Sequence, residues 1–159
     1  MMHLHKYEKI WLAFGVASLV LFLTIIAITA FGFHHHPATG MDIIDPKKVK
    51  QTAPFDHPGV NKIDNDTYEV VLIGKTFGYE PTRLQVPVGK KIVFKLTSTD
   101  VIHSFSIVHT NVNMMVVPGR INTKEYTFKK TGNYLVLCNE YCGAGHQFMQ
   151  TTIEVVKGE

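Results

Sequence analysis

The sequence has few cysteines, few charged residues and almost no excess of one charge sign. With 2 cysteines in 159 residues, neither a disulfide framework nor a four-thiolate zinc site can form within the chain. The 16 Lys and Arg against 13 Asp and Glu leave a net charge of +3, so nucleic-acid binding through a basic surface is not expected. Hydrophobic residues make up 45% of the chain and charged residues 18%, which excludes intrinsic disorder. The length excludes a large multidomain enzyme.

Charge is absent altogether from residues 10–33, where the hydrophobic excess lies. This run of 24 residues has no Asp, Glu, Lys, Arg or His, and about 20 apolar residues suffice for a membrane-spanning helix. A cleaved secretory signal is the alternative, but its apolar region is about 7–15 residues long and small residues follow it. Lys6 and Lys9 precede the run. The positive-inside rule therefore predicts a single-pass anchor in the cell membrane, with residues 1–9 in the cytoplasm and the rest of the chain outside.

Helical periodicity is lacking in residues 66–159, where short β-rich segments alternate with Gly, Pro and Asn. The predicted strands are Tyr68–Lys75, Arg83–Val86, Lys91–Thr97, His103–Val108, Glu125–Phe128, Tyr134–Leu137 and Thr151–Val156. Such a series, at spacings typical of antiparallel sheets, predicts an all-β sandwich or small barrel and excludes a Rossmann-type parallel sheet. Residues 34–65 contain Pro and Gly breakers and little periodic hydrophobicity, which predicts a linker or an arm that lies along the surface of the domain. Within it, the histidine triplet 34–36 fits a solvated turn at the membrane or an adventitious metal site.

The residues suited to chemistry are concentrated in residues 138–149, with the sequence CNEYCGAGHQFM. This segment lies between two predicted strands and is therefore expected to be a loop at one end of the sandwich. Thiolate, imidazole and thioether form a soft ligand set that selects copper over magnesium, calcium or manganese. Cys142, His146, Met149 and one upstream histidine would suffice for a mononuclear blue-copper site, which leaves Cys138 unexplained. A Cys138–Cys142 disulfide and a zinc site are the alternatives.

His103 is the predicted upstream ligand, because it begins an apolar strand next to a turn. The other candidates beyond the anchor are His57, in a Pro-rich stretch, and His109, near a predicted turn. Both are interpreted as surface histidines.

The pattern Cys-x-Glu-x-Cys-Gly-x-x-His-x-x-Met, with a histidine about 35 residues upstream, resembles the CuA site of subunit II of haem-copper oxidases. The resemblance implies a Greek-key, cupredoxin-like sandwich that holds two copper ions per chain as a dinuclear centre. It implies the following ligands: Cys138 and Cys142 as bridging thiolates, His103 and His146 as terminal imidazoles, Met149 as a weak thioether, and Glu140 through its backbone carbonyl.

The single anchor, together with Phe77-Gly78-Tyr79 and Asp100-Val101-Ile102-His103, is similar to the B-type branch of that family. Subunit II of that branch has one membrane span, where the A-type has two. The A-type takes electrons in through a tryptophan beside the copper, whereas the only tryptophan here is Trp11, at the membrane. The resemblance therefore implies Phe77 as the electron-entry aromatic, with a buried core phenylalanine as the alternative. It also implies Glu8 at the cytoplasmic mouth of a proton path, with a solvated charge at a helix start as the alternative.

The function that the resemblance implies is electron entry into a proton-translocating cytochrome c oxidase. The chain would accept electrons from a soluble or lipid-anchored cytochrome c and pass them to haem in the catalytic subunit I, which reduces oxygen to water. A free-standing membrane-anchored copper carrier and a copper chaperone or sensor are the alternatives. A nitrous oxide reductase needs a further catalytic domain that 159 residues cannot contain. The near balance of charge predicts an apolar contact with the donor near the copper loop.

Overall fold

The computed structural model describes residues 5–32 and 39–158 and divides into two compact units, Met1–Pro37 and Ala38–Glu159. Phe33, at the end of the predicted anchor, and the histidine triplet 34–36 lie outside the described residues.

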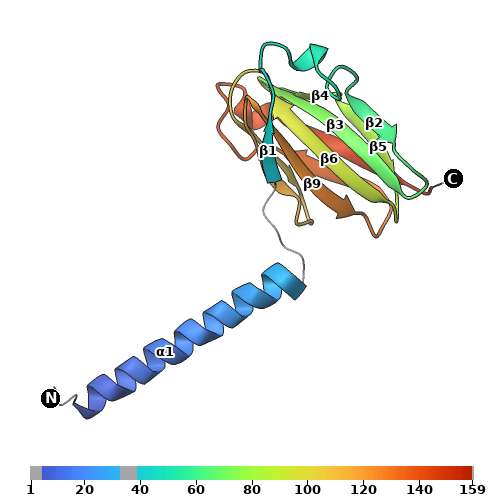
Figure 1. Cartoon of the computed structure of the whole chain (residues 1–159). Helices are drawn as coiled ribbons and strands as arrows, with labels where there is room; N and C mark the ends of the chain where they lie inside the picture. The colour runs from blue at the N-terminus through green and yellow to red at the C-terminus, as the bar shows by residue number, and fades with distance from the viewer. Residues whose placement is uncertain (1–4, 33–38, 159) are drawn as a thin grey trace. The chain divides into compact units, whose positions relative to one another are not determined.

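The first unit is an apolar helix, α1 (Lys6–Ala27), which one π-helical turn (Ile28–Gly32) continues (Figure 1). No residue of α1 is buried, and the segment Lys6–Gly32 reaches a mean hydropathy of 2.5. The Glu8 carboxylate accepts a hydrogen bond of 2.7 Å from the backbone N–H of His5, at the positive end of the helix dipole. By length and composition this helix can cross a membrane, in agreement with the predicted anchor.

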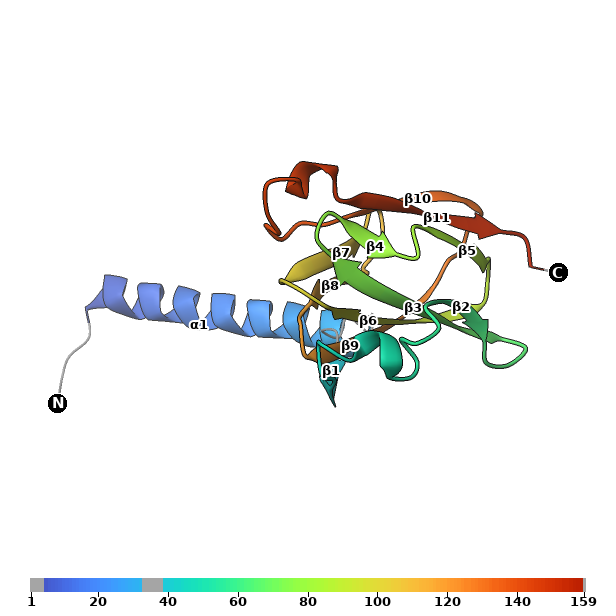
Figure 2. The ribbon, with the colours of Figure 1, turned by 90° about the horizontal axis from the view of Figure 1, so that it is seen from above.

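The second unit is a sandwich of two β-sheets (Figures 1 and 2). One sheet has the order β1-β9-β6-β3-β2, with β4 also paired to β3, and the other has the order β5-β11-β10-β7-β8. The strands of the first sheet are β1 (Thr39–Ile43), β2 (Gly59–Lys62), β3 (Thr67–Lys75), β4 (Gly78–Glu80), β6 (Lys91–Ser98) and β9 (Arg120–Thr127). Those of the second are β5 (Arg83–Pro87), β7 (His103–Ile107), β8 (Asn113–Val116), β10 (Gly132–Leu137) and β11 (Gln150–Val156).

The sandwich confirms the predicted fold class, and each predicted strand has a counterpart in it. The pairing differs from the antiparallel expectation at two places, because β3 pairs with β6 and β5 pairs with β11 in parallel. Parallel partners need a long connection, so the hydrophobic pattern of a single strand does not reveal them.

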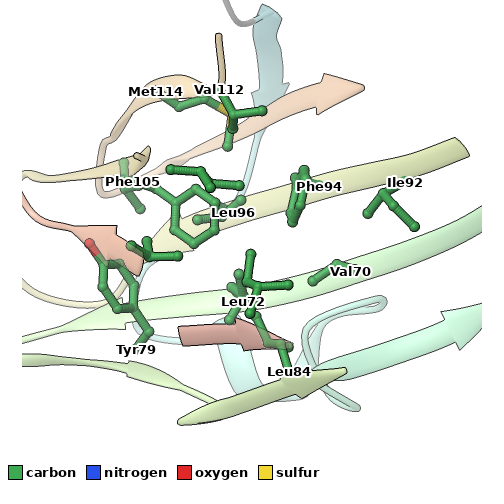
Figure 3. Packing of buried hydrophobic residues seen from close by; sticks show 14 of the residues in the cluster. Val70, Leu72, Tyr79, Leu84, Ile92, Phe94, Leu96, Phe105, Val112 and Met114 are labelled. Carbon is green, nitrogen blue, oxygen red and sulfur yellow. The ribbon is translucent and has the colours of Figure 1, made fainter. Parts of the chain in front are cut away.

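The core between the sheets forms because alternate residues of each strand point inward, as in Ile92, Phe94 and Leu96 of β6. Figure 3 shows Phe94 and Phe105 packed together, and their ring centroids are 5.5 Å apart. The same buried cluster extends to two cysteines and a methionine at one end of the sandwich, namely Cys138, Cys142 and Met149. The candidate ligands are therefore anchored in the main core.

Of residues 34–65, predicted as a linker or a surface-hugging arm, the described part, residues 39–65, lies against the folded unit as such an arm. Its β1 pairs with β9 and its β2 pairs with β3. Ile44 and Phe55 are buried, in a second cluster that includes Val71 and Ile73 of β3. The physical reason is that β3 is buried on both faces, so the face turned away from the main core needs a cover, which this segment supplies.

A pair of neighbouring isoleucines tests whether this cover stabilises the domain. Ile44 is 4% exposed and Ile43 is 83% exposed. We expect Ile44→Ala to lower the free energy of unfolding by about 2–5 kcal/mol, because it opens a cavity in the second cluster. Ile43→Ala should change it by less than about 0.5 kcal/mol. Urea unfolding of the full chain in detergent, followed by circular dichroism of the β-structure, measures both; equal effects would mean that the segment behaves as a linker.

Candidate metal centre

The loop of residues 138–149 connects β10 to β11, and the pairing of these two strands fixes both of its ends. Leu137 faces Gln150 in the ladder, and the backbone N–H of Cys138 donates to the Met149 carbonyl at 3.2 Å. Within the loop, the backbone N–H of His146 donates to the Gly143 carbonyl at 3.0 Å, which begins a short 3₁₀ turn (His146–Phe148). The first and last candidate ligands of the loop are therefore brought side by side.

The sulfur and imidazole groups of this loop converge on one buried point. The Cys142 Sγ atom lies 3.5 Å from His146 Nδ1 and 3.5 Å from Met149 Sδ. The Cys138 Sγ atom lies 3.2 Å from the backbone carbonyl oxygen of Glu140. Both cysteines are free thiols, so the disulfide alternative does not describe this structure.

His103, the first residue of β7, approaches the same point although it lies far from the loop in the sequence. Its ring is fully buried, and its Nε2 lies 2.8 Å from the carboxylate Oδ1 of Asp100. A neutral imidazole that donates through Nε2 keeps a lone pair on Nδ1. His103 Nδ1 is buried and has no hydrogen-bond partner among the described residues. The ligand atoms of His103, Cys138 and Cys142 all lie within 4.8 Å of one another.

Asp100 orients His103 and is the residue whose role the sequence analysis did not predict. Burial acts to raise the pKa of the Asp100 carboxyl, but hydrogen bonds from Thr76, His103 and the Val101 backbone outweigh it and hold the pKa far below its usual range. Asp100 is therefore a carboxylate, which favours the Nε2–H tautomer of His103. Its position three residues before the histidine, at the start of a strand, is the only trace of this role in the sequence.

The electrostatics of the thiols reflect their burial and their closeness. Burial and the neighbouring Cys138 raise the pKa of the Cys142 thiol above its usual value. Burial, followed by the effect of Cys138, also raises the pKa of Tyr79, whose hydroxyl donates to the Ser104 carbonyl. The backbone N–H of Ser104 in turn points at Cys138 Sγ, at 3.5 Å. A bound cation would oppose this rise in the thiol pKa, because it stabilises the thiolates directly.

The chemistry of this donor set fits copper. Two thiols, two imidazoles and a thioether are soft or intermediate ligands, and the buried lone pair on His103 Nδ1 lacks only an electrophile. A structural zinc site would use the cysteines and histidines but would leave the buried thioether of Met149 without a purpose.

The other residues singled out in the sequence lie at the surface, either exposed or half-exposed. The Glu140 side chain is exposed, so only its backbone carbonyl faces the cysteines, and His109 is on the surface as predicted. His57 is also exposed. Phe77 is 45% exposed and is therefore not the core phenylalanine that was the alternative interpretation. Its ring lies against the loop at Gly143 and Gly145.

Large apolar side chains surround the candidate ligands at the surface. We call them the apolar rim: Phe77, Val101, Ile102, Tyr141 and Phe148. Tyr141 and Phe148 are 75% and 73% exposed, and each directly adjoins a candidate ligand in the sequence. Exposed aromatic side chains grouped around a functional loop are typical of a contact surface for another protein.

Comparison with known proteins adds a family to this geometry. Residues 74–156 match the family model described as cytochrome c oxidase subunit II, periplasmic domain. Cytochrome c oxidase subunit 2 of Thermus thermophilus is 44% identical over 154 residues, which cover 94% of this chain and 91% of that protein. The probable cytochrome c oxidase subunit 2 of Rickettsia prowazekii is 31% identical over 96% of this chain and 50% of its own length.

Two solved structures extend the comparison to the fold. A chain from the cryo-EM structure of a haem-copper terminal oxidase dimer is 29% identical, with a TM-score of 0.82 over 95% of this chain and 100% of that chain. The crystal structure of the periplasmic domain of subunit II of cytochrome oxidase from Bradyrhizobium japonicum is 28% identical. Its TM-score is 0.53, over 56% of this chain and 83% of that one.

Proposed function

Because the chain belongs to the cytochrome c oxidase subunit II family, we propose that its cluster of sulfur and imidazole groups is a dinuclear copper centre of the CuA type. The chain is the electron-entry subunit of a haem-copper oxidase. The observation that carries the proposal is the lone pair of His103 Nδ1, which is buried without a hydrogen-bond partner in the described chain and lies beside two free thiols.

Six residues supply the ligands of the proposed centre. Cys138 and Cys142 would supply shared thiolates, and His103 and His146 would supply imidazoles. Met149 would add a weak thioether ligand, and Glu140 would add its backbone carbonyl.

The surrounding fold suits a site that carries electrons without moving. Bound copper supplies a one-electron couple whose charge is shared over both sulfurs. Cys138 and Met149 are held by the β10–β11 ladder, and Asp100 fixes the ring of His103. The backbone N–H of Ser104, aimed at Cys138 Sγ, and the apolar cover around the thiols tune the potential.

The proposed partners follow from two surfaces of the chain, the apolar rim and helix α1. Cytochrome c docks on the apolar rim, where the half-exposed ring of Phe77 is the proposed entry point for electrons. The haem-bearing catalytic subunit receives the electrons and reduces oxygen. Helix α1, whose residues are all unburied, lies in the cell membrane with its N-terminus in the cytoplasm and the copper domain outside.

Membership of the B-type branch is the finer part of the proposal. It is supported by the single helix of the described chain that is apolar enough to span a membrane, and by the position of Trp11 in that helix, far in sequence from the copper loop. In this branch Glu8 lies at the cytoplasmic mouth of a proton path.

Copper content and electron paramagnetic resonance test the dinuclear centre. We expect two copper ions per chain that share one unpaired electron, with hyperfine structure from two equivalent nuclei. Cys138→Ser should abolish this pattern, because one bridge is lost. Asn139→Ser, at the exposed neighbouring position, should retain it. One copper per chain with the hyperfine pattern of a single nucleus in the unmodified protein would instead indicate a blue-copper-like carrier.

Replacement of rim aromatics tests the docking surface. Removing the exposed rings with Tyr141→Ser and Phe148→Ser should weaken cytochrome c binding about ten-fold, since large aromatic side chains dominate such contacts. Ile63→Ser is the control, because Ile63 is exposed beside Thr67 at the other end of β3. Stopped-flow electron transfer measures both, and the rate should depend only weakly on ionic strength. A steep fall with added salt would point to charged docking instead.

Glu8→Gln in the assembled oxidase tests the proton path. The amide can still accept the hydrogen bond from His5 but cannot carry a proton, so proton uptake and oxygen turnover should fall while α1 stays intact. Unchanged turnover and proton uptake would leave Glu8 as a helix-terminal charge only.

A further inference from the structure

The turn between β3 and β4 holds Phe77 in an unusual backbone conformation. Its φ angle is 66°, in the left-handed region that bulky residues rarely adopt. Contacts flank the turn on both sides: the backbone N–H and the hydroxyl of Thr76 both donate to Asp100, and Lys75 forms an ion pair of 3.3 Å with Glu80. A bulky residue keeps such a backbone conformation only where the surrounding structure holds it there. The conformation of Phe77 is therefore held by its contacts.

The first consequence of this turn is the position of the Phe77 ring. A Cβ atom added at Gly145 would lie 2.7–3.0 Å from three atoms of the ring, which is closer than such atoms approach. Gly145 itself has a φ of −100°, which any residue can adopt. The glycine is therefore required at position 145 by the ring and not by the backbone.

Gly143 provides the contrast within the same loop. Its φ is 126°, which disfavours any side chain whatever lies nearby, and an added Cβ would be 3.3 Å from the Phe77 ring. The ring thus covers the loop backbone from Gly143 to Gly145, between the ligands Cys142 and His146.

The second consequence concerns the candidate ligands on either side of these glycines. Cys142 Sγ lies 3.5 Å from His146 Nδ1, and both residues flank the backbone that the ring covers. The contact between the ring and the loop therefore bears on the spacing of two candidate ligands.

We propose that Phe77 is a positioning residue for the metal-binding loop, which it holds in its ligating shape through the packing of its ring on Gly143 and Gly145. This contact between the Phe77 ring and the loop, which we call the lock, is present in the folded chain before copper binds. Its packing part is independent of the proposed function, and only its effect on copper retention rests on that function.

A double-mutant cycle between positions 77 and 145 tests the lock in the copper-free full chain in detergent. Gly145→Ala should lower the midpoint of thermal unfolding, because its methyl group meets the Phe77 ring. Phe77→Gly removes the ring and keeps the left-handed turn. In the double variant the added methyl group should cost nothing further, so its midpoint should equal that of Phe77→Gly.

Gly143→Ala is the matched control, because its backbone strain is independent of the ring. Phe77→Gly should not rescue it. If the effects of Gly145→Ala and Phe77→Gly simply add, or if Phe77→Gly rescues both alanine variants equally, the lock is refuted.

Copper retention supplies a second measurement that a purely structural contact would not change. After copper loading, Phe77→Gly should lose copper to a chelator about ten-fold faster than the unmodified chain, with an altered hyperfine pattern. Phe77→Ala should lose it at least as fast, because alanine also lacks the ring and opposes the left-handed turn at position 77. An unmodified chain that binds no copper would overturn the proposed function while leaving the copper-free cycle interpretable.

Discussion

The pairing of β10 with β11 is the constraint on which the rest of the site depends. Six successive residue pairs from Gly132↔Val155 to Leu137↔Gln150 set the register, and one more hydrogen bond joins Cys138 to Met149. A slip of one residue in either strand would turn the buried side chains of that strand outward. The register that fills the core with Val136 and Ile153 thus also turns Cys138 and Met149 inward.

The local part of the site could be predicted from the sequence, because its chemistry is contained in the spacing of residues 138–149. His103 is different, since it lies far along the chain and reaches the cysteines through the pairing of β7 with β10. Its strand and the adjoining turn indicated one end of the sandwich but not which end. Asp100 and Thr76 could not be predicted as its supports, because their roles depend on contacts between separate loops.

The strands could be predicted from the sequence, but the cover over the second face of β3 could not. β6 alternates, whereas Val70–Ile73 of β3 is a continuous apolar run, which is the pattern of a strand buried on both faces. That run requires a second cover, and the segment before β3 provides it. The Pro and Gly residues of that segment mark turns in an ordered cover as well as they mark a linker, so composition alone could not separate the two.

The supports of the site come from separate elements. Asp100 holds His103, the β10–β11 pairing holds Met149, and the β3–β4 turn packs on the loop at Gly145 through the ring of Phe77. A loop tied in this way cannot relax one ligand without straining another, which favours small displacements when the charge of a bound metal changes. One face of the Phe77 ring packs on the loop, and the other face is exposed and can contact a partner protein. The same side chain can therefore hold the loop in place and give an electron donor access to the centre.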